Sequence, residues 1–153
     1  MEATIGVTFE YNPVSQFDQG GLLIYLDSDH WMKCGLEFCD GKILLSVVIC
    51  NHGYSDWSTQ NWGDVPSCKL RVHKVPYHDS VVVEAASTTG VEKDVFRFVR
   101  IAHLSTDSAR AKGLSWQVGP FAACPTAQKE CHTNFTEFFV GPKLETEHKA
   151  VLL

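Results

Sequence analysis

The sequence lacks a long apolar run, an excess of basic residues and a secretory leader. Its longest apolar stretch, ILLSVVIC at residues 43–50, is far shorter than the roughly 20 residues that span a bilayer. The formal net charge is −5 and no basic cluster is interleaved with aromatic residues, which argues against binding to nucleic acid or anionic membranes. The N-terminal MEATIGVTFEYNP has no basic start followed by an apolar run. These absences predict a cytoplasmic protein with neither a membrane nor a nucleic-acid partner.

Metal-ligand spacings are also missing. The seven His and six Cys form no CxxC, HxH or HExxH pattern, so we expect no bound metal and no cofactor. Cys124 and Cys131 bracket a loop, and whether they pair is left open by their spacing. In a reducing compartment free thiols are the expectation. The other four Cys lie in apolar runs, where a thiol acts as a small hydrophobic side chain: Cys34, Cys39, Cys50 and Cys68.

What the sequence does contain is alternation of apolar and polar residues with a period of two, which predicts β-strands. Asp40-Gly41 between two such runs is a hairpin signal. Residues 52–62, HGYSDWSTQNW, are expected to form an aromatic-rich loop, and only residues 108–113 and 126–131 look briefly helical. The pattern predicts an all-β antiparallel two-sheet sandwich of the jelly-roll type over residues 1–142, with a tail at 143–153. The expected strands are residues 3–11, 21–27, 30–39, 42–51, 68–75, 80–87, 95–104, 114–124 and 132–141.

Strand parity predicts which side chains face the core. In HWMKCGLEFC (residues 30–39), one face is wholly apolar and should be buried: Met32, Cys34, Leu36 and Phe38. The opposite face carries Trp31, Lys33 and Glu37, and parity adds Tyr25 and Ser46 from neighbouring strands.

Arg100 falls among large apolar residues of its own strand and therefore needs a carboxylate partner or a polar cavity. Glu37 and Asp56 are both candidates, because parity does not decide between them. If Glu37 is the partner, Arg100 joins the polar face that carries Lys33.

Five segments follow one another in an order that resembles a known family: FDQGGLLIYLDSDHWMKCGLEFCDG, LLSVVICNHGYSDWST, FRFVRIAHL, VGPFAACPT and FTEFFVGP. They resemble, over residues 17–142, the domain family of unknown function that includes the fungal "regulation of enolase protein". The resemblance implies a concanavalin-A-like sandwich. Members of that family carry some tens of residues before the strand that begins here at Ala3. A sandwich lacking such N-terminal strands would expose a sheet edge, which favours an oligomer through that edge.

The polar face suggests a function. In concanavalin-A-like sandwiches such a face is often concave and binds sugars, and aromatic rings beside carboxylates and amides suit carbohydrate. We expect Trp57 to be a buried ring, and Tyr54 and Trp62 to be the better stacking residues. The leading hypothesis is a non-catalytic domain that binds a carbohydrate or sugar phosphate, or that regulates a partner. The candidate binding residues are Tyr25, Trp31, Lys33, Glu37, Tyr54, Asp56, Trp57, Trp62 and Arg100.

Two alternatives come from other classes. A glycoside hydrolase would need two carboxylates that face one sugar, and Glu37 with Asp56 across the strands is the candidate pair. A protein-interaction module acting on a metabolic enzyme is implied by the name of the resembled family.

Overall fold

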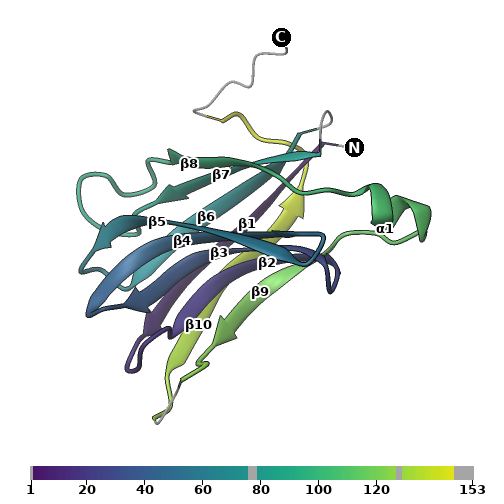
Figure 1. Cartoon of the computed structure of the whole chain (residues 1–153). Coiled ribbons are helices and arrows are strands. Elements are labelled where there is room, and N and C mark those ends of the chain that lie inside the picture. The colour runs from purple at the N-terminus through teal and green to yellow at the C-terminus, as the bar shows by residue number, and fades with distance from the viewer. Residues whose placement is uncertain (1, 76–78, 127–128, 147–153) are drawn as a thin grey trace.

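The protein is a two-layer antiparallel β-sandwich, seen in a computed structural model that describes residues 2–75, 79–126 and 129–146 (Figure 1). One sheet has the strand order β10-β1-β6-β7-β8 and is called sheet A; the other, sheet B, has the order β5-β4-β3-β2-β9. A short helix, α1 (Asp107–Ala111), follows β8. The strands are β1 (Ala3–Asn12), β2 (Gln19–Asp27), β3 (His30–Cys39), β4 (Lys42–Asn51), β5 (Tyr54–Gly63), β6 (Ser67–Lys74), β7 (Ser80–Ala86), β8 (Arg97–His103), β9 (Gln117–Ala123) and β10 (His132–Gly141).

The core lies between the two sheets and is built from the alternating apolar residues that parity selects. The predicted core residues of β3 are buried, except that Phe38, near the end of the strand, is only half-buried. Asp40 and Gly41 both adopt positive φ, 52° and 75°, as a two-residue hairpin of the primed type requires. Large, fully buried side chains of both sheets include Phe9, Leu22, Ile24, Met32, Leu36 and Leu70.

The main departure from the sequence-based expectation is residues 52–62. They do not form a loop: Tyr54–Gly63 is strand β5, which pairs with β4 and forms one edge of sheet B. Nearly the whole strand is exposed on both faces, so it carries no apolar alternation that would reveal a strand. The helical expectation for residues 108–113 is met over 108–111, within α1. The expected helical segment at residues 126–131 includes 127–128, which lie outside the described residues.

A buried polar chain lies on the outer face of sheet A. Leu144 N–H donates to Thr4 Oγ1 (2.8 Å), Thr4 Oγ1 contacts His73 Nδ1 (2.9 Å), and His73 Nε2 contacts Glu84 Oε2 (3.0 Å). The side chains of His73 and Glu84 are 0% and 1% exposed. Burial is the main reason that the pKa of His73 lies below its usual 6.5, so we read this imidazole as neutral, with Nε2–H donating to the carboxylate.

The cysteines divide into two groups. Cys34, Cys39, Cys50 and Cys68 are buried free thiols, as expected for residues of apolar strands, and burial raises the pKa of Cys34 to about 12. Cys124 and Cys131 form a disulfide, which corrects the expectation that they too would be free. The bond spans the connection from β9 in sheet B to β10 in sheet A.

No helix among the described residues is long and apolar enough to cross a membrane.

Candidate functional site

The outer face of sheet B carries most of the predicted site residues, and its register arranges them in rows across the strands. One row pairs Tyr25 with Trp31. The next runs through Leu23, Lys33, Val48 and Trp57. A third runs through Phe121, Gly21, Gly35, Ser46 and Thr59, and a fourth through Gln19, Glu37, Leu44 and Asn61. The third row consists mostly of small residues, so it lies lower than the rows on either side.

Two glycines form the floor of this third row. A methyl group on Gly35 would meet the Gly20 carbonyl and would lie 2.8 Å from Gly21 Cα. A methyl group on Gly21 would in turn meet the Cys34 carbonyl and lie 2.6 Å from Gly35 Cα. The two backbones therefore approach as closely as they do only because neither residue has a side chain.

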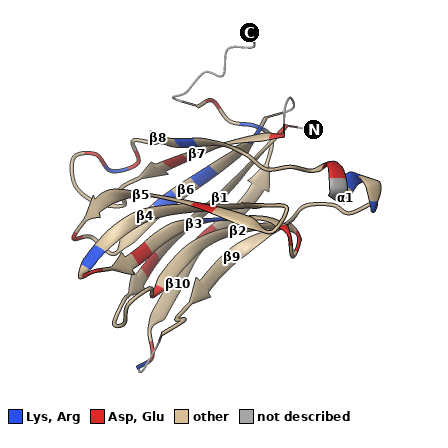
Figure 2. Cartoon of the chain, in the orientation of Figure 1, with Lys and Arg blue, Asp and Glu red and all other residues tan. Residues whose placement is uncertain are grey.

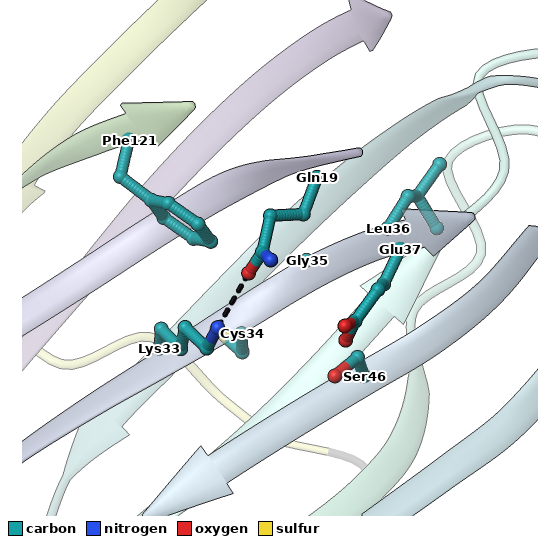
Figure 3. A pocket seen from close by; sticks show the side chains of 8 residues that line it. All are labelled: Gln19, Lys33, Cys34, Gly35, Leu36, Glu37, Ser46 and Phe121. Atoms are coloured by element: carbon teal, nitrogen blue, oxygen red, sulfur yellow. Dashed lines mark hydrogen bonds between the residues drawn. The ribbon is translucent and has the colours of Figure 1, made fainter. Parts of the chain in front are cut away.

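A small hollow opens over Gly35, with polar side chains on its walls (Figure 3). Lys33 Nζ donates to Gln19 Oε1 (2.5 Å) on one side. Glu37 and Ser46 lie on the other side, and Phe121 stands near Gln19. The hollow is narrow and has no room for a whole sugar ring. It has no room even for a water molecule, so a ligand would contact the polar side chains at its rim.

Glu37 is the most unusual member of this group. Its side chain is buried, with the residue only 7% exposed, yet no hydrogen bond or ion pair to its carboxylate is found in the described part of the chain. Its oxygens are not among the fully buried atoms that lack a partner, so the carboxylate still reaches solvent at the hollow. The arrangement therefore leaves one strong acceptor, Glu37, and the remaining donors of Lys33 directed at the same small space.

The aromatic residues are distributed differently from the prediction. Trp57 is not buried: it is 49% exposed on the outer face, and its Nε1–H donates to Ser46 Oγ (2.8 Å). Trp62, expected to be a stacking residue, packs against the core and donates to Ser67 O (3.1 Å). Tyr54 is 84% exposed at the start of β5. Phe121 lines the hollow itself, and Trp57 borders it through its bond to Ser46.

Arg100 and Asp56 belong to another part of the molecule. Arg100 lies on β8 in sheet A and bonds Asp56 Oδ2 (2.8 Å) and Ser58 Oγ (2.9 Å) of β5. Asp56 pairs with Ile49, a core residue, whereas Glu37 pairs with Leu44 on the outer face. Glu37 and Asp56 therefore point to opposite faces of sheet B. The structure does not bring them together as the carboxylate pair that a glycoside hydrolase needs.

Charged residues of both signs are interspersed over the two sheets (Figure 2). Most of the ion pairs among the described residues include an exposed partner, such as Lys69–Asp94 and Arg97–Glu92. This distribution provides no extended basic surface, in keeping with the acidic composition.

A second polar group, which the sequence patterns did not reveal, joins two turns. His30 Nδ1 contacts Asp27 Oδ1 (2.8 Å), and His30 Nε2 contacts His52 Nδ1 (3.3 Å). Gly53 N–H also donates to Asp29 O (3.1 Å). Pairing of β3 with β4 brings these residues together, so local spacing carries no signal of them. The group fastens the β2–β3 turn to the β4–β5 turn.

Asp27 should make the free energy of unfolding depend on pH in the acid range. The hydrogen bond from His30 is the main reason that the pKa of Asp27 falls from 3.8 to about 2. The stabilisation is then complete above pH 4 and is lost as the pH falls through 2. Asp27→Asn should remove this part of the acid dependence, measured by urea unfolding between pH 2 and pH 5. Asp107→Asn, at an exposed carboxylate, is the control. An unchanged acid profile in Asp27→Asn would contradict the assignment.

A larger cavity lies at the end of the sandwich near α1. Its volume is about 640 Å³, within the size range of small-molecule sites. Its wall is mostly apolar, with Lys74, Asp79 and Arg110 as charged groups. Lys74 Nζ lies 4.3 Å from the centre of the Trp116 ring, and Arg110 is paired with Asp79 (2.6 Å). The residues come from six elements and the loops between them, which explains why no sequence motif marks the cavity.

Comparison with known proteins supports the resemblance inferred from the sequence. A curated relative, "Regulation of enolase protein 1" of Saccharomyces cerevisiae, is 47% identical over 49 residues, which are 32% of this chain and 24% of the relative. The matched segment therefore spans about a quarter of that relative.

Solved structures confirm the fold. A functionally unknown protein from Saccharomyces cerevisiae superposes with a TM-score of 0.76 at 28% identity, covering 94% of this chain and 71% of its own. A mutant of the GH43 protein BlXynB from Bacillus licheniformis gives 0.77 at 14% identity, over 93% of this chain and 28% of its own. The xylan beta-1,4-xylosidase from Bacillus halodurans C-125 gives 0.72 at 16% identity, over 92% and 27%. The two bacterial likenesses show a shared sandwich only.

The family model "Protein of unknown function (DUF1349)" matches residues 1–143. This match covers nearly the whole sandwich, from the first strand to just beyond the last. The chain therefore belongs to the DUF1349 family of proteins of unknown function.

Proposed function

We propose that this protein is a non-catalytic, cytoplasmic binding module that recognises a sugar or a sugar phosphate on the outer face of sheet B. The observation that carries the proposal is Glu37 opposite Lys33: the residue is 7% exposed, and its carboxylate makes no hydrogen bond within the described residues. An exposed tryptophan ring, Trp57, lies on the same face. A carboxylate accepts from sugar hydroxyls, and an ammonium donates to hydroxyl or phosphate oxygens. The Trp57 ring offers an apolar surface on which a pyranose can stack.

The size of the hollow limits how such a ligand would bind. Since the hollow has no room for a ring, the sugar would lie across the face and bond to the polar groups at the rim. Gly21 and Gly35 let β2 and β3 lie close together beneath it, because a side chain at either position would collide with the neighbouring strand. The ligand would then be held by a few directional bonds and by stacking, which favours a modest affinity.

Isothermal titration with neutral monosaccharides, oligosaccharides and hexose phosphates tests the proposal. We expect Glu37→Gln to weaken binding of the recognised sugar at least tenfold, because hydrogen bonds to a charged group are worth about 1.5–3 kcal/mol. Trp57→Ala should weaken it as well. Glu137→Gln, on the exposed outer face of sheet A, is the matched control and should leave the affinity unchanged.

Two outcomes would contradict the proposal. One is the absence of binding to every sugar and sugar phosphate in the panel. The other is binding that shifts the amide NMR signals of Trp116 and Arg110, which line the larger cavity, and leaves those of Lys33 and Glu37 in place. The second outcome would mean that the protein binds a sugar or sugar phosphate in the larger cavity and not on the outer face of sheet B.

We also propose a second function, a protein-interaction module whose partner is a metabolic enzyme. The observation that favours it is the exposed edge strand β5 with Tyr54 at 84% exposure, and the curated relative's name points to enolase. Titration with purified enolase from the same organism should give saturable binding that Tyr54→Ala weakens. No heat of binding and no co-sedimentation with enolase would count against this function.

A further inference from the structure

Three buried polar atoms without partners lie near the end of the sandwich where the Cys124–Cys131 disulfide lies between β9 and β10. Among the described residues, Tyr11 Oη, Asp18 Oδ1 and Thr133 Oγ1 are buried and make no hydrogen bond. Tyr11 and Thr133 are directly paired across β1 and β10. Asp18 immediately precedes β2, and the start of β2 pairs with the end of β9, where Gln19 is opposite Ala123.

Asp18 is held firmly by one of its two oxygens only. Asp18 Oδ2 accepts hydrogen bonds from the backbone N–H groups of Val14 and Ser15, both at 2.7 Å. The residue is 0% exposed, and Oδ1 has no partner in the described part of the chain. A fixed, buried carboxylate oxygen with a free lone pair is costly unless something binds to it.

Two sulfur atoms lie close to the Asp18 carboxylate. One carboxylate oxygen of Asp18 and the Sγ atoms of Cys124 and Cys131 all lie within 4.8 Å of one another. Zn²⁺ binds thiolates at about 2.3 Å and carboxylate oxygens at about 2.0–2.2 Å, so its ligand atoms are roughly 3.5 Å apart. The cluster therefore needs only small movements to surround such an ion. Cys124 and Cys131 are half-buried, so reagents can reach their sulfur atoms.

We propose that Asp18, Cys124 and Cys131 form a Zn²⁺ site that becomes available when the disulfide is reduced. Two thiolates and one carboxylate are three protein ligands, and a water molecule completes the tetrahedron. The bond between the sulfurs blocks the site, because sulfurs in a disulfide are no longer thiolate ligands.

The chemistry requires one co-reactant, a dithiol reductant. The dithiol transfers two electrons and two protons to the disulfide, which becomes two thiols, while the dithiol closes to its own disulfide. Binding of Zn²⁺ then releases the two thiol protons and leaves two thiolates on the metal. The site would thus be filled under reducing conditions and closed under oxidising ones.

Titration with Co²⁺ as a spectroscopic substitute for Zn²⁺ tests the site in the full chain. Reduced protein should take up one Co²⁺ with a thiolate-to-cobalt absorption band, and Zn²⁺ should displace it. Oxidised protein should show no such band. Asp18→Asn keeps both thiols and should weaken Co²⁺ binding at least tenfold. The double variant Cys124→Ser/Cys131→Ser should lose the absorption band.

Cys50→Ser is the matched control, because Cys50 is a buried thiol outside the cluster and should leave uptake unchanged. Circular dichroism of each reduced variant checks that it remains folded. Failure of the folded, reduced wild-type protein to bind Co²⁺ would overturn the proposal, as would equal binding by the double variant. If the oxidised protein bound Co²⁺ as well as the reduced protein does, the proposed dependence of the site on disulfide reduction would be wrong.

Discussion

Gly35→Ala is expected to destabilise the folded protein by about 3 kcal/mol, at the upper end of the usual cost of overpacking. The added methyl group would collide with the Gly20 carbonyl and would lie 2.8 Å from Gly21 Cα. Both are backbone atoms, which cannot rotate away as a flexible side chain can. The strands β2 and β3 would have to separate at the centre of sheet B, breaking their ladder. Equilibrium unfolding in urea measures the loss.

Gly119→Ala on β9 is the control for this substitution. A methyl group there has no atom within 4 Å, so we expect the free energy of unfolding to change by less than about 0.5 kcal/mol. If Gly35→Ala were as stable as Gly119→Ala, the close approach of β2 and β3 described above would be wrong.

His73→Ala is expected to cost about 3 kcal/mol, because it removes a hydrogen bond to a buried carboxylate and leaves a cavity at a fully buried position. Glu84, only 1% exposed on its side chain, would lose its contact with His73 Nε2, and Thr4 would lose its contact with Nδ1. Chemical denaturation at pH 7 gives the difference. Glu92→Ala, at a carboxylate 63% exposed, should cost less than about 1 kcal/mol.

A double variant separates two contributions to the free energy of unfolding: the cost of removing His73 alone, and the net contribution of the His73–Glu84 contact. His73→Leu/Glu84→Leu removes both partners and should be much less destabilised than His73→Ala. The pH dependence gives a second test. Because burial lowers the pKa of His73, its contribution is complete above pH 6.5 and falls as the unfolded chain takes up a proton below that pH. An equal loss in the double and single variants would contradict the account.

The sandwich was predictable because most strands are half-buried and alternate accordingly. The parity of Met32, Cys34 and Leu36 against Lys33 and Glu37 is reproduced in the structure. Lys33 and Glu37 lie on the outer face because the intervening residues fill the core. The sequence named Asp56 and Glu37 as candidate partners of Arg100, and the structure selects Asp56. The choice depends on which strand of sheet B faces β8, and that is a property of the whole fold.

Other parts of the site depend on contacts between distant residues, and local patterns do not encode such contacts. Trp57 and Trp62 are five residues apart on one strand, a spacing that directs two side chains to opposite faces in a regular strand. Trp62 is the extra residue of a bulge opposite Ile43 and Leu44. It nevertheless lies on the opposite face from Trp57 and packs against the core. The contact between His30 and His52 and the approach of Asp18 to Cys124 and Cys131 are likewise set by strand pairing.

The polar composition that conceals β5 in the sequence has a consequence for solubility. An edge strand offers unpaired backbone groups to any other chain, and proteins with open sheets must discourage that association. Here the Asp56 carboxylate is tied to Arg100 (2.8 Å), and the other exposed residues are mostly hydroxyls and amides, together with the rings of Tyr54 and Trp57. A strand with this composition, bulged near its end, is a poor template for amyloid-like stacking. The border of sheet B is therefore protected against aggregation by the same residues that make it look like a loop.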